Sequence, residues 1–252
     1  MPSSPASWPY SPLIAHRGAG RYAPENTLAA IRLGAQHRFT MMEYDVKLSR
    51  DGVPVLLHDD TLDRTSSGTG PAGDLTLAEL AGIDFGAWHS RDFAGEPIAT
   101  LFSVAAYTLA NGIHSNIEIK PTTGVEAETG REVALAARTL WATATLPPLL
   151  SSFSREALAA ARDAAPELPR ALLFGRELPP DWLDAARELQ CGGINLNDRS
   201  VTPDIARQVL DAGFTLAVYT VNNPERAREL LAMGCHGIFT DEIMTISPVY
   251  FP

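Results

Sequence analysis

Short runs of β-forming apolar residues alternate with amphipathic stretches along most of the chain. Such alternation predicts a parallel sheet covered by helices. Seven or eight of these units in about 240 residues fit a closed (β/α)₈ TIM barrel better than two Rossmann halves. The expected strands are Leu13–His16, Met42–Leu48, Val53–His58, Asn116–Lys120, Leu149–Phe153, Ala171–Phe174, Gly193–Leu196, Thr215–Val221 and Gly237–Thr240. The expected helices are Thr27–His37, Thr76–Gly82, Phe102–Asn111, Glu126–Thr143, Arg155–Ala164, Pro180–Leu189, Pro203–Ala212 and Pro224–Met233.

The remaining segments fit around this α/β barrel. Residues 1–12 are rich in Pro and Ser and predict a disordered N-terminal tail. Residues 13–252 form the predicted single barrel domain, and residues 60–98, rich in Gly, Asp and Ser, predict a small insertion between early barrel units. Neither G-x-G-x-x-G after the first strand nor G-x-x-x-x-G-K-[ST] occurs, which removes the main support for a dinucleotide or P-loop site.

Charge and composition restrict the classes of partner and the cellular location that we expect for the protein. Thirty acidic against twenty basic residues give a net charge of −10, which opposes general nucleic-acid binding. The chain has neither the run of about 18–20 apolar residues that a membrane helix needs nor the pattern of a secretory signal. Cys191 and Cys235 lack zinc-type spacing and are expected to be buried free thiols in a reducing cytoplasm.

Polar residues collect where the predicted strands end. The first strand ends in His16 and is followed by Arg17, and another run ends in His58. Glu43 and Asp45 lie two residues apart on one strand, so their side chains point to the same side. Glu118 and Lys120 have the same spacing on another strand. The C-terminal ends of barrel strands carry active sites, so these groups predict one site.

Carboxylates inside a barrel repel each other and ionise poorly unless a cation neutralises them. The all-oxygen set of Glu43, Asp45 and Glu118 favours one hard divalent ion, Mg²⁺ or Ca²⁺. A metal-free network paired with Lys and Arg is the alternative. The sequence predicts the metal site in preference to that network.

Two strand-end histidines beside such a cluster suit acid–base chemistry. One neutral and one protonated imidazole provide a general base and a general acid near neutral pH. Arg17 adds a planar fork suited to phosphate or carboxylate, and Lys120 adds a compact charge. This set suits phosphoryl transfer. The other histidines are expected to be structural, namely His37, His89, His114 and His236.

The combined motifs resemble those of the glycerophosphodiester phosphodiesterase family, in its bacterial cytosolic form. The resemblance runs from Leu13 to about Asp241, and its motifs occur in order at the spacing of barrel units. They are His16-Arg17-Gly18, Pro24-Glu25-Asn26-Thr27, Glu43-x-Asp45-Val46, Asp51-Gly52, Pro54-Val55, His58-Asp59, Leu62-Asp63-Arg64-Thr65, Gly68, Gly70, Ile117-Glu118-Ile119-Lys120-Pro121, Tyr219-Thr220-Val221-Asn222 and Gly237-Ile238-Phe239-Thr240-Asp241.

The resemblance implies roles for matching residues. His16 and His58 would be the acid–base pair, and Arg17 would hold the phosphate. Glu43, Asp45 and Glu118 would bind the metal. Lys120, Asn26 and Tyr219 would contact the substrate or its phosphate. Asn26 would also support the loop after the first strand, where a helix N-terminus favours anions.

Two positions depart from the family pattern. Tyr219 stands where members often carry Trp, which affects how the alcohol or glycerol moiety packs. The usual Pro-Thr-Leu-Glu segment reads Ala99-Thr100-Leu101-Phe102, outside the catalytic set.

The implied activity is metal-dependent hydrolysis of a small-molecule glycerophosphodiester to glycerol 3-phosphate and an alcohol through a cyclic phosphate. The alternatives are a lysophospholipase-D-like or cyclising phosphodiesterase of the same superfamily, and a non-catalytic binding module on the same barrel. The head-group alcohol, the choice between Mg²⁺ and Ca²⁺, and the oligomeric state stay open.

Overall fold

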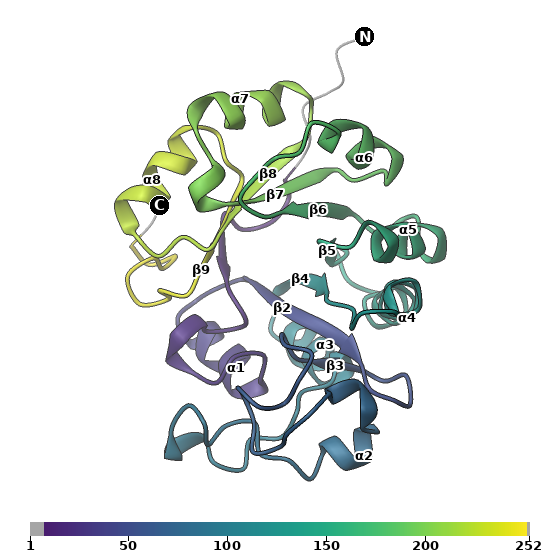
Figure 1. Ribbon diagram of the computed structural model, residues 1–252. Helices are drawn as coiled ribbons and strands as arrows, with labels where there is room; N and C mark the ends of the chain where they lie inside the picture. Colours follow the sequence, from purple (N-terminus) through teal and green to yellow (C-terminus); the bar gives the residue numbers. More distant parts are fainter. Residues whose placement is uncertain (1–7, 251–252) are drawn as a thin grey trace.

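A computed structural model describes residues 8–250 and shows a closed barrel surrounded by helices (Figure 1). Of its nine strands, all but β3 (Pro54–Leu56) run parallel, which gives the eight strands of the barrel. The barrel closes where β1 pairs with both β2 and β9. The predicted TIM barrel is therefore confirmed. The barrel strands are β1 (Leu13–Ala15), β2 (Met41–Leu48), β4 (His114–Ile119), β5 (Leu149–Ser152), β6 (Arg170–Phe174), β7 (Gly193–Asn197), β8 (Thr215–Tyr219) and β9 (Gly237–Thr240).

Most of the α-helices in the described residues begin at a polar capping residue. Thr27, Thr100, Ser154, Thr202 and Asn223 each accept a backbone N–H of the first turn through the side chain, which satisfies a donor that the helix leaves unpaired. The α-helices are α1 (Leu28–Gln36), α2 (Leu77–Leu80), α3 (Leu101–Ala110), α4 (Glu126–Leu140), α5 (Arg155–Ala164), α6 (Trp182–Glu188), α7 (Pro203–Asp211) and α8 (Pro224–Ala232). The 3₁₀ turns are Gly20–Tyr22, Ala72–Asp74, Arg91–Phe93 and Asp198–Ser200.

Strand β3 differs from the expected parallel strand over Val53–His58. It pairs antiparallel with the end of β2, with Lys47 opposite Val55. The chain thus turns back at the rim of the barrel and runs back along β2, where the N–H of Leu57 donates to the carbonyl of Asp45, so His58 lies beside Asp45 and not beyond the end of β2. The insertion that follows, residues 60–98 and called the excursion below, includes α2 and shares a small apolar core with β3 and the residue after it. That core consists of Val55, Leu57, Leu62, Ala72, Leu80, Phe85 and Ile98.

Residues 8–12 are ordered against the barrel, in contrast to the disordered tail predicted over residues 1–12. Residues 1–7 lie outside the described residues. Tyr10 is buried, and its hydroxyl donates to the carbonyl of Pro147. Trp8 stacks edge-on against Tyr10. This segment covers the apolar N-terminal end of the barrel, and the Pro/Ser-rich composition concealed that two aromatic side chains were available for burial.

Two apolar layers hold the barrel together. The large outer layer fills the space between strands and helices. The inner layer consists of Ile14, Met41, Leu149, Ala171, Ala217 and Phe239 together with Tyr10. Since strand side chains alternate, the next inward residues lie nearer the C-terminal ends of the strands, and most of them are polar, among them His16, Glu43 and Ser151. None of the helices in the described part of the chain is both long and apolar enough to span a membrane.

Candidate active site

Neighbouring strands β2 and β4 bring three carboxylates together. Asp45 lies directly opposite Glu118 in the parallel pair, and Glu43 lies one inward position earlier on β2. Each of the three residues offers a carboxylate oxygen within 4.8 Å of those of the other two, and all three side chains are buried. Oε1 of Glu43 is buried without a hydrogen-bond partner. The structure therefore assembles the predicted acidic triad, Glu43, Asp45 and Glu118, and leaves one of its oxygens free to bind a ligand.

Burial and mutual repulsion make it unfavourable for all three carboxyls of the triad to be ionised at once. Burial, followed by the charge of Asp45, raises the pKa of Glu43 to about 8 and that of Glu118 to about 7. Burial also acts to raise the pKa of Asp45, but nearby Arg17 and Lys120 outweigh it and lower that pKa to about 2. Raised pKa values of this kind are expected of clustered carboxyls from which a divalent cation would displace protons.

His16 follows β1 and is held by a residue from the other end of the chain. Its Nδ1 donates to Oδ1 of Asp241 at 2.7 Å, and Asn222 in turn donates to the same carboxylate. Nε2 of His16 lies 3.8 Å from Oε2 of Glu43. Burial lowers the pKa of His16, but the hydrogen bond to Asp241 and the charge of Glu43 outweigh it, so the pKa is raised.

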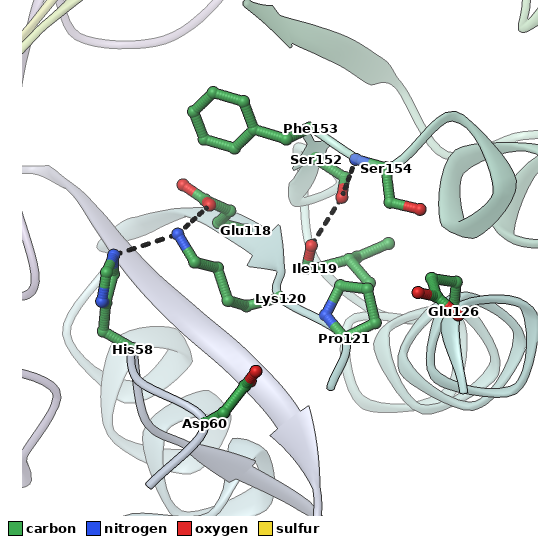
Figure 2. A pocket seen from close by; sticks show the side chains of 10 residues that line it. All are labelled: His58, Asp60, Glu118, Ile119, Lys120, Pro121, Glu126, Ser152, Phe153 and Ser154. Carbon is green, nitrogen blue, oxygen red and sulfur yellow. Dashed lines mark hydrogen bonds and ion pairs between the residues drawn. The ribbon is translucent and has the colours of Figure 1, made fainter. Parts of the chain in front are cut away.

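His58 has a parallel arrangement on the other side of the triad. Nδ1 of His58 lies 2.6 Å from Oδ1 of Asp59, and Nε2 lies 3.0 Å from Nζ of Lys120 (Figure 2). A lysine ammonium only donates, so Nε2 accepts and Nδ1–H donates to Asp59. Burial lowers the pKa of His58, and the charges of Arg17 and Lys120 add to that effect. Together they outweigh the carboxylates of Asp45 and Asp59, so the pKa of His58 is lowered.

The loop after β1 places Arg17 and Asn26 by means of left-handed backbone. Arg17 has φ 51° and Asn26 has φ 60°, which Asn adopts readily. Gly18 has φ 93°, and a Cβ there would meet the backbone N of Ile31 in α1 at 2.9 Å, so the close approach of loop and helix requires glycine. The loop thereby turns both side chains towards β2.

Both residues contact Asp45. The Asn26 side chain donates to Oδ2 of Asp45 at 2.9 Å and accepts the backbone N–H of Asp45 at 3.0 Å. Arg17 places Nε 3.5 Å from Oδ2 of Asp45, and that buried Nε has no hydrogen-bond partner. Nη1 of Arg17 donates to Glu25. Arg17 therefore keeps donor capacity for an anion beside the triad.

Lys120 and Tyr219 are already engaged. Nζ of Lys120 donates to Glu118 at 3.0 Å and lies over the ring of Phe153. The Tyr219 hydroxyl donates to the carbonyl of Phe174 at 2.6 Å, and the Tyr219 ring stacks edge-on against Phe153. For the predicted contact with substrate, Tyr219 therefore has its ring available but not its hydroxyl.

Each histidine faces a cavity. A cavity of about 420 Å³ is lined by His58, Glu118 and Lys120 (Figure 2). A second, of about 390 Å³, is lined by His16 and Arg17. Larger cavities of about 550 and 510 Å³ lie away from these residues, one over α3 and α4 and one at the N-terminal end of the barrel. The two cavities thus open beside the two histidines, and Glu118 of the triad lines the first of them.

Several residues of the site had no role assigned from sequence. Asp59 and Asp241 orient the two histidines, and Asn222 orients Asp241. The adjacent pair His58-Asp59 was a usable signal, because a carboxylate commonly fixes an imidazole. The partner of His16 lies 225 positions away and gave no local signal. Glu25 and Arg64 belong to motifs of the family, but the sequence alone indicates no role for either.

Comparison with known proteins shows one family. The family model for glycerophosphoryl diester phosphodiesterases matches residues 16–245. The Bacillus subtilis (strain 168) protein YhdW is 33% identical over 235 residues, which cover 91% of this chain and 93% of YhdW. The glycerophosphodiester phosphodiesterase of Caldanaerobacter subterraneus is 32% identical over 234 residues, covering 93% and 95%.

A solved structure supports the same likeness. The Oleispira antarctica phosphodiesterase OLEI02445, determined in complex with the product sn-glycerol-3-phosphate, superposes with a TM-score of 0.86. It is 33% identical, and the match covers 92% of this chain and 94% of that one.

Proposed function

The chain belongs to the glycerophosphoryl diester phosphodiesterase family, and we propose that it hydrolyses glycerophosphodiesters with one divalent cation and two catalytic histidines. The products would be glycerol 3-phosphate and an alcohol. One observation carries the proposal: His16 and His58, each fixed by its own carboxylate, flank a buried acidic triad. The product bound to the Oleispira antarctica phosphodiesterase supports the same substrate class.

The triad fits a hard divalent cation. Its donors are all carboxylate oxygens, and Oε1 of Glu43 is buried without a partner. Glu43, Asp45 and Glu118 would hold Mg²⁺ or Ca²⁺, both of which prefer oxygen ligands. The bound ion would supply positive charge next to the phosphate and polarise oxygens bound to it.

The first chemical step forms a cyclic phosphate. One histidine takes the proton of the glycerol hydroxyl adjacent to the phosphoester, and that oxygen attacks phosphorus. The other histidine gives its proton to the departing alcohol oxygen as the phosphorus–oxygen bond breaks. Intramolecular attack is efficient because proximity gives effective molarities of roughly 10⁵–10⁸ M.

The second step opens the ring with the histidine roles reversed. The histidine that gave up its proton now takes one from water, whose oxygen attacks phosphorus. The other returns its proton to the glycerol oxygen, which regenerates the starting protonation states. Arg17 and Lys120 would contact the phosphate in both steps, and Arg17 can stabilise charge on the phosphate with its planar fork.

The substrate is a small molecule, and we place the enzyme in the cytoplasm. The location is supported by Cys191 and Cys235, which are both buried and unpaired, as expected of thiols in a reducing compartment.

Phosphorus NMR tests the proposed reaction. Purified protein is incubated with glycerophosphocholine, glycerophosphoethanolamine and a lysophospholipid in Mg²⁺, in Ca²⁺ and in EDTA. We expect glycerol 3-phosphate from the two glycerophosphodiesters with metal and none in EDTA. Turnover of the lysophospholipid alone, or an end product that stays cyclic, would favour the lysophospholipase-D-like or cyclising alternative, and absence of metal-dependent turnover would favour a binding module.

A further inference from the structure

Arg64 joins two carboxylates that belong to different parts of the site. Its Nε donates to Oδ2 of Asp59 at 2.6 Å and Nη2 to Oδ1 at 3.0 Å. Its Nη1 donates to Oε2 of Glu25 at 2.7 Å and Nη2 to Oε1 at 2.8 Å. One guanidinium thus forms a two-point contact with each carboxylate.

Each of these carboxylates also accepts a hydrogen bond from a residue that the proposed mechanism uses. Asp59 accepts from Nδ1 of His58, and Glu25 accepts from Nη1 of Arg17. We propose that Arg64 is a positioning residue that fixes His58 and Arg17 relative to each other through Asp59 and Glu25. The inference rests on the proposed function, in which His58 moves a proton and Arg17 binds the phosphate.

The geometry favours a brace over a substrate-binding role. An arginine has five N–H donors, and Arg64 directs four contacts at carboxylates, which leaves little donor capacity for a phosphate. Lysine has the same charge but lacks the planar fork that grips two carboxylates in fixed orientation. Arg64 lies in the excursion after β3, so this segment contributes a residue to the site.

A second cation holds the same loop independently. Lys47 is buried on β2, and its Nζ donates to the backbone carbonyl of Asp59 at 2.5 Å and to Oδ1 of Asp60 at 2.9 Å. The loop that carries His58 is therefore anchored by Lys47 when Arg64 is removed. An Arg64 variant is expected to fold, with a loosened Asp59 side chain as the main local change.

Charge gives the brace a measurable signature. The charged groups around His58 are Asp45 and Asp59, which favour its imidazolium, and Arg17 and Lys120, which oppose it. Arg64 neutralises much of the charge of Asp59, and its hydrogen bonds lower the pKa of that carboxyl. Without Arg64, His58 meets the full charge of Asp59, so its pKa rises and the acid limb of the pH–rate profile moves to higher pH.

The experiment compares Arg64→Leu and Arg64→Lys with Arg50→Leu. Arg50 is a matched control, because it also forms an exposed ion pair with the excursion, through Glu79, and contacts no residue of the site. We expect Arg64→Leu to lower kcat/KM by roughly 10–100-fold, the usual effect of losing a residue that orients a catalytic group. Arg64→Lys should stay nearer to Arg64→Leu than to wild type, and Arg50→Leu should stay within about twofold of wild type.

The pH profile and a double variant separate positioning from structure. Arg64→Leu should shift the acid limb upwards, whereas in the Asp59→Asn background the same substitution should leave that limb in place. Arg64→Leu matching Arg50→Leu in rate and profile would overturn the inference, as would full activity in Arg64→Lys. If wild type hydrolyses no glycerophosphodiester, the proposed function fails first and is recognised by that result alone.

Discussion

Nδ1 of His16 lies 2.7 Å from Oδ1 of Asp241, although the two residues are separated by 225 positions. The pairing of β1 with β9, which sets Ala15 opposite Thr240, brings them together when the barrel closes. Since Asp241 occupies Nδ1, the other ring nitrogen of His16 is directed to the triad. His58 and Asp59 repeat this relationship, so both histidines present Nε2 to the site.

The two histidines should produce a bell-shaped dependence of kcat/KM on pH. The pKa of His58 lies below the ordinary 6.5 and that of His16 lies above it. Between these values one imidazole is neutral while the other is protonated, which is the state that acid–base catalysis needs. We expect the acid limb below pH 6.5 and the basic limb above it. An unchanged acid limb in His58→Ala, measured on its residual activity, would exclude His58 from the pair.

The metal-free protein should lose stability as pH rises. A carboxyl whose pKa is higher in the folded than in the unfolded state holds its proton more tightly when folded, so raising the pH favours unfolding. The pKa of Glu43 rises from 4.5 to about 8 and that of Glu118 to about 7. In EDTA, Tm should therefore decrease as pH rises from 4.5 towards 8, and added Mg²⁺ or Ca²⁺ should reverse the decrease.

Glu43→Gln provides the control for this prediction. The variant removes one of the two raised carboxyls, so its Tm in EDTA should vary less with pH than that of wild type. Calorimetric titration should show weaker metal binding, because Gln is a neutral ligand. Equal metal affinity in the two proteins would remove Glu43 from the ligand set.

The barrel could be predicted because its signals are local. Strand–helix alternation and capping residues such as Thr202 before Pro203 act over a few residues, and the structure has helices at these places. The direction of β3 could not be read this way, since an apolar run is compatible with either orientation. Its antiparallel pairing depends on the tight return at residues 49–53, where Gly52 has φ 76°.

The site was predictable in its charges but not in its connections. Period-two spacing placed Glu43 and Asp45 on one side of a strand, and the register of β2 with β4 completed the triad with Glu118. The contacts of Arg64 with Glu25 and Asp59 join segments that share no sequence period. Such contacts follow from the shape of the excursion, which only the three-dimensional packing defines.

Arg17→Lys should reduce activity although it preserves the charge. Arg17 uses Nη1 for Glu25 and keeps Nε, which is buried without a partner, beside the triad. A lysine has a single nitrogen and cannot serve both positions. The expected loss in kcat/KM corresponds to about 1–3 kcal/mol of transition-state binding, the range for a charged hydrogen bond. An unchanged kcat/KM would make Arg17 a structural residue.

Tyr219→Phe should affect stability more than rate. The Tyr219 hydroxyl donates to the carbonyl of Phe174, and its loss removes one hydrogen bond worth about 1 kcal/mol. The ring and its edge contact with Phe153 remain, so kcat/KM should stay close to wild type. Tyr219→Leu removes the ring and should raise KM. A large fall in kcat for Tyr219→Phe would instead show that the hydroxyl leaves Phe174 to bind substrate.

Substrates with different leaving groups should show which of His16 and His58 is the general acid and which is the general base. Each single change to Ala should reduce the rate on a glycerophosphodiester by about 10²–10⁴, the usual contribution of general acid–base catalysis. The double variant should lose little more than the worse single variant, because the two residues act as a unit.

An activated aryl leaving group needs little protonation as it departs. It should therefore restore much of the rate in the variant that lacks the acid and little in the variant that lacks the base. Metal titration is run in parallel, since a histidine that only orients a metal ligand would have its rate restored by saturating metal. If both Ala variants respond equally to the aryl substrate, His16 and His58 do not divide into acid and base in the bond-breaking step, even where the protein proves to be a phosphodiesterase.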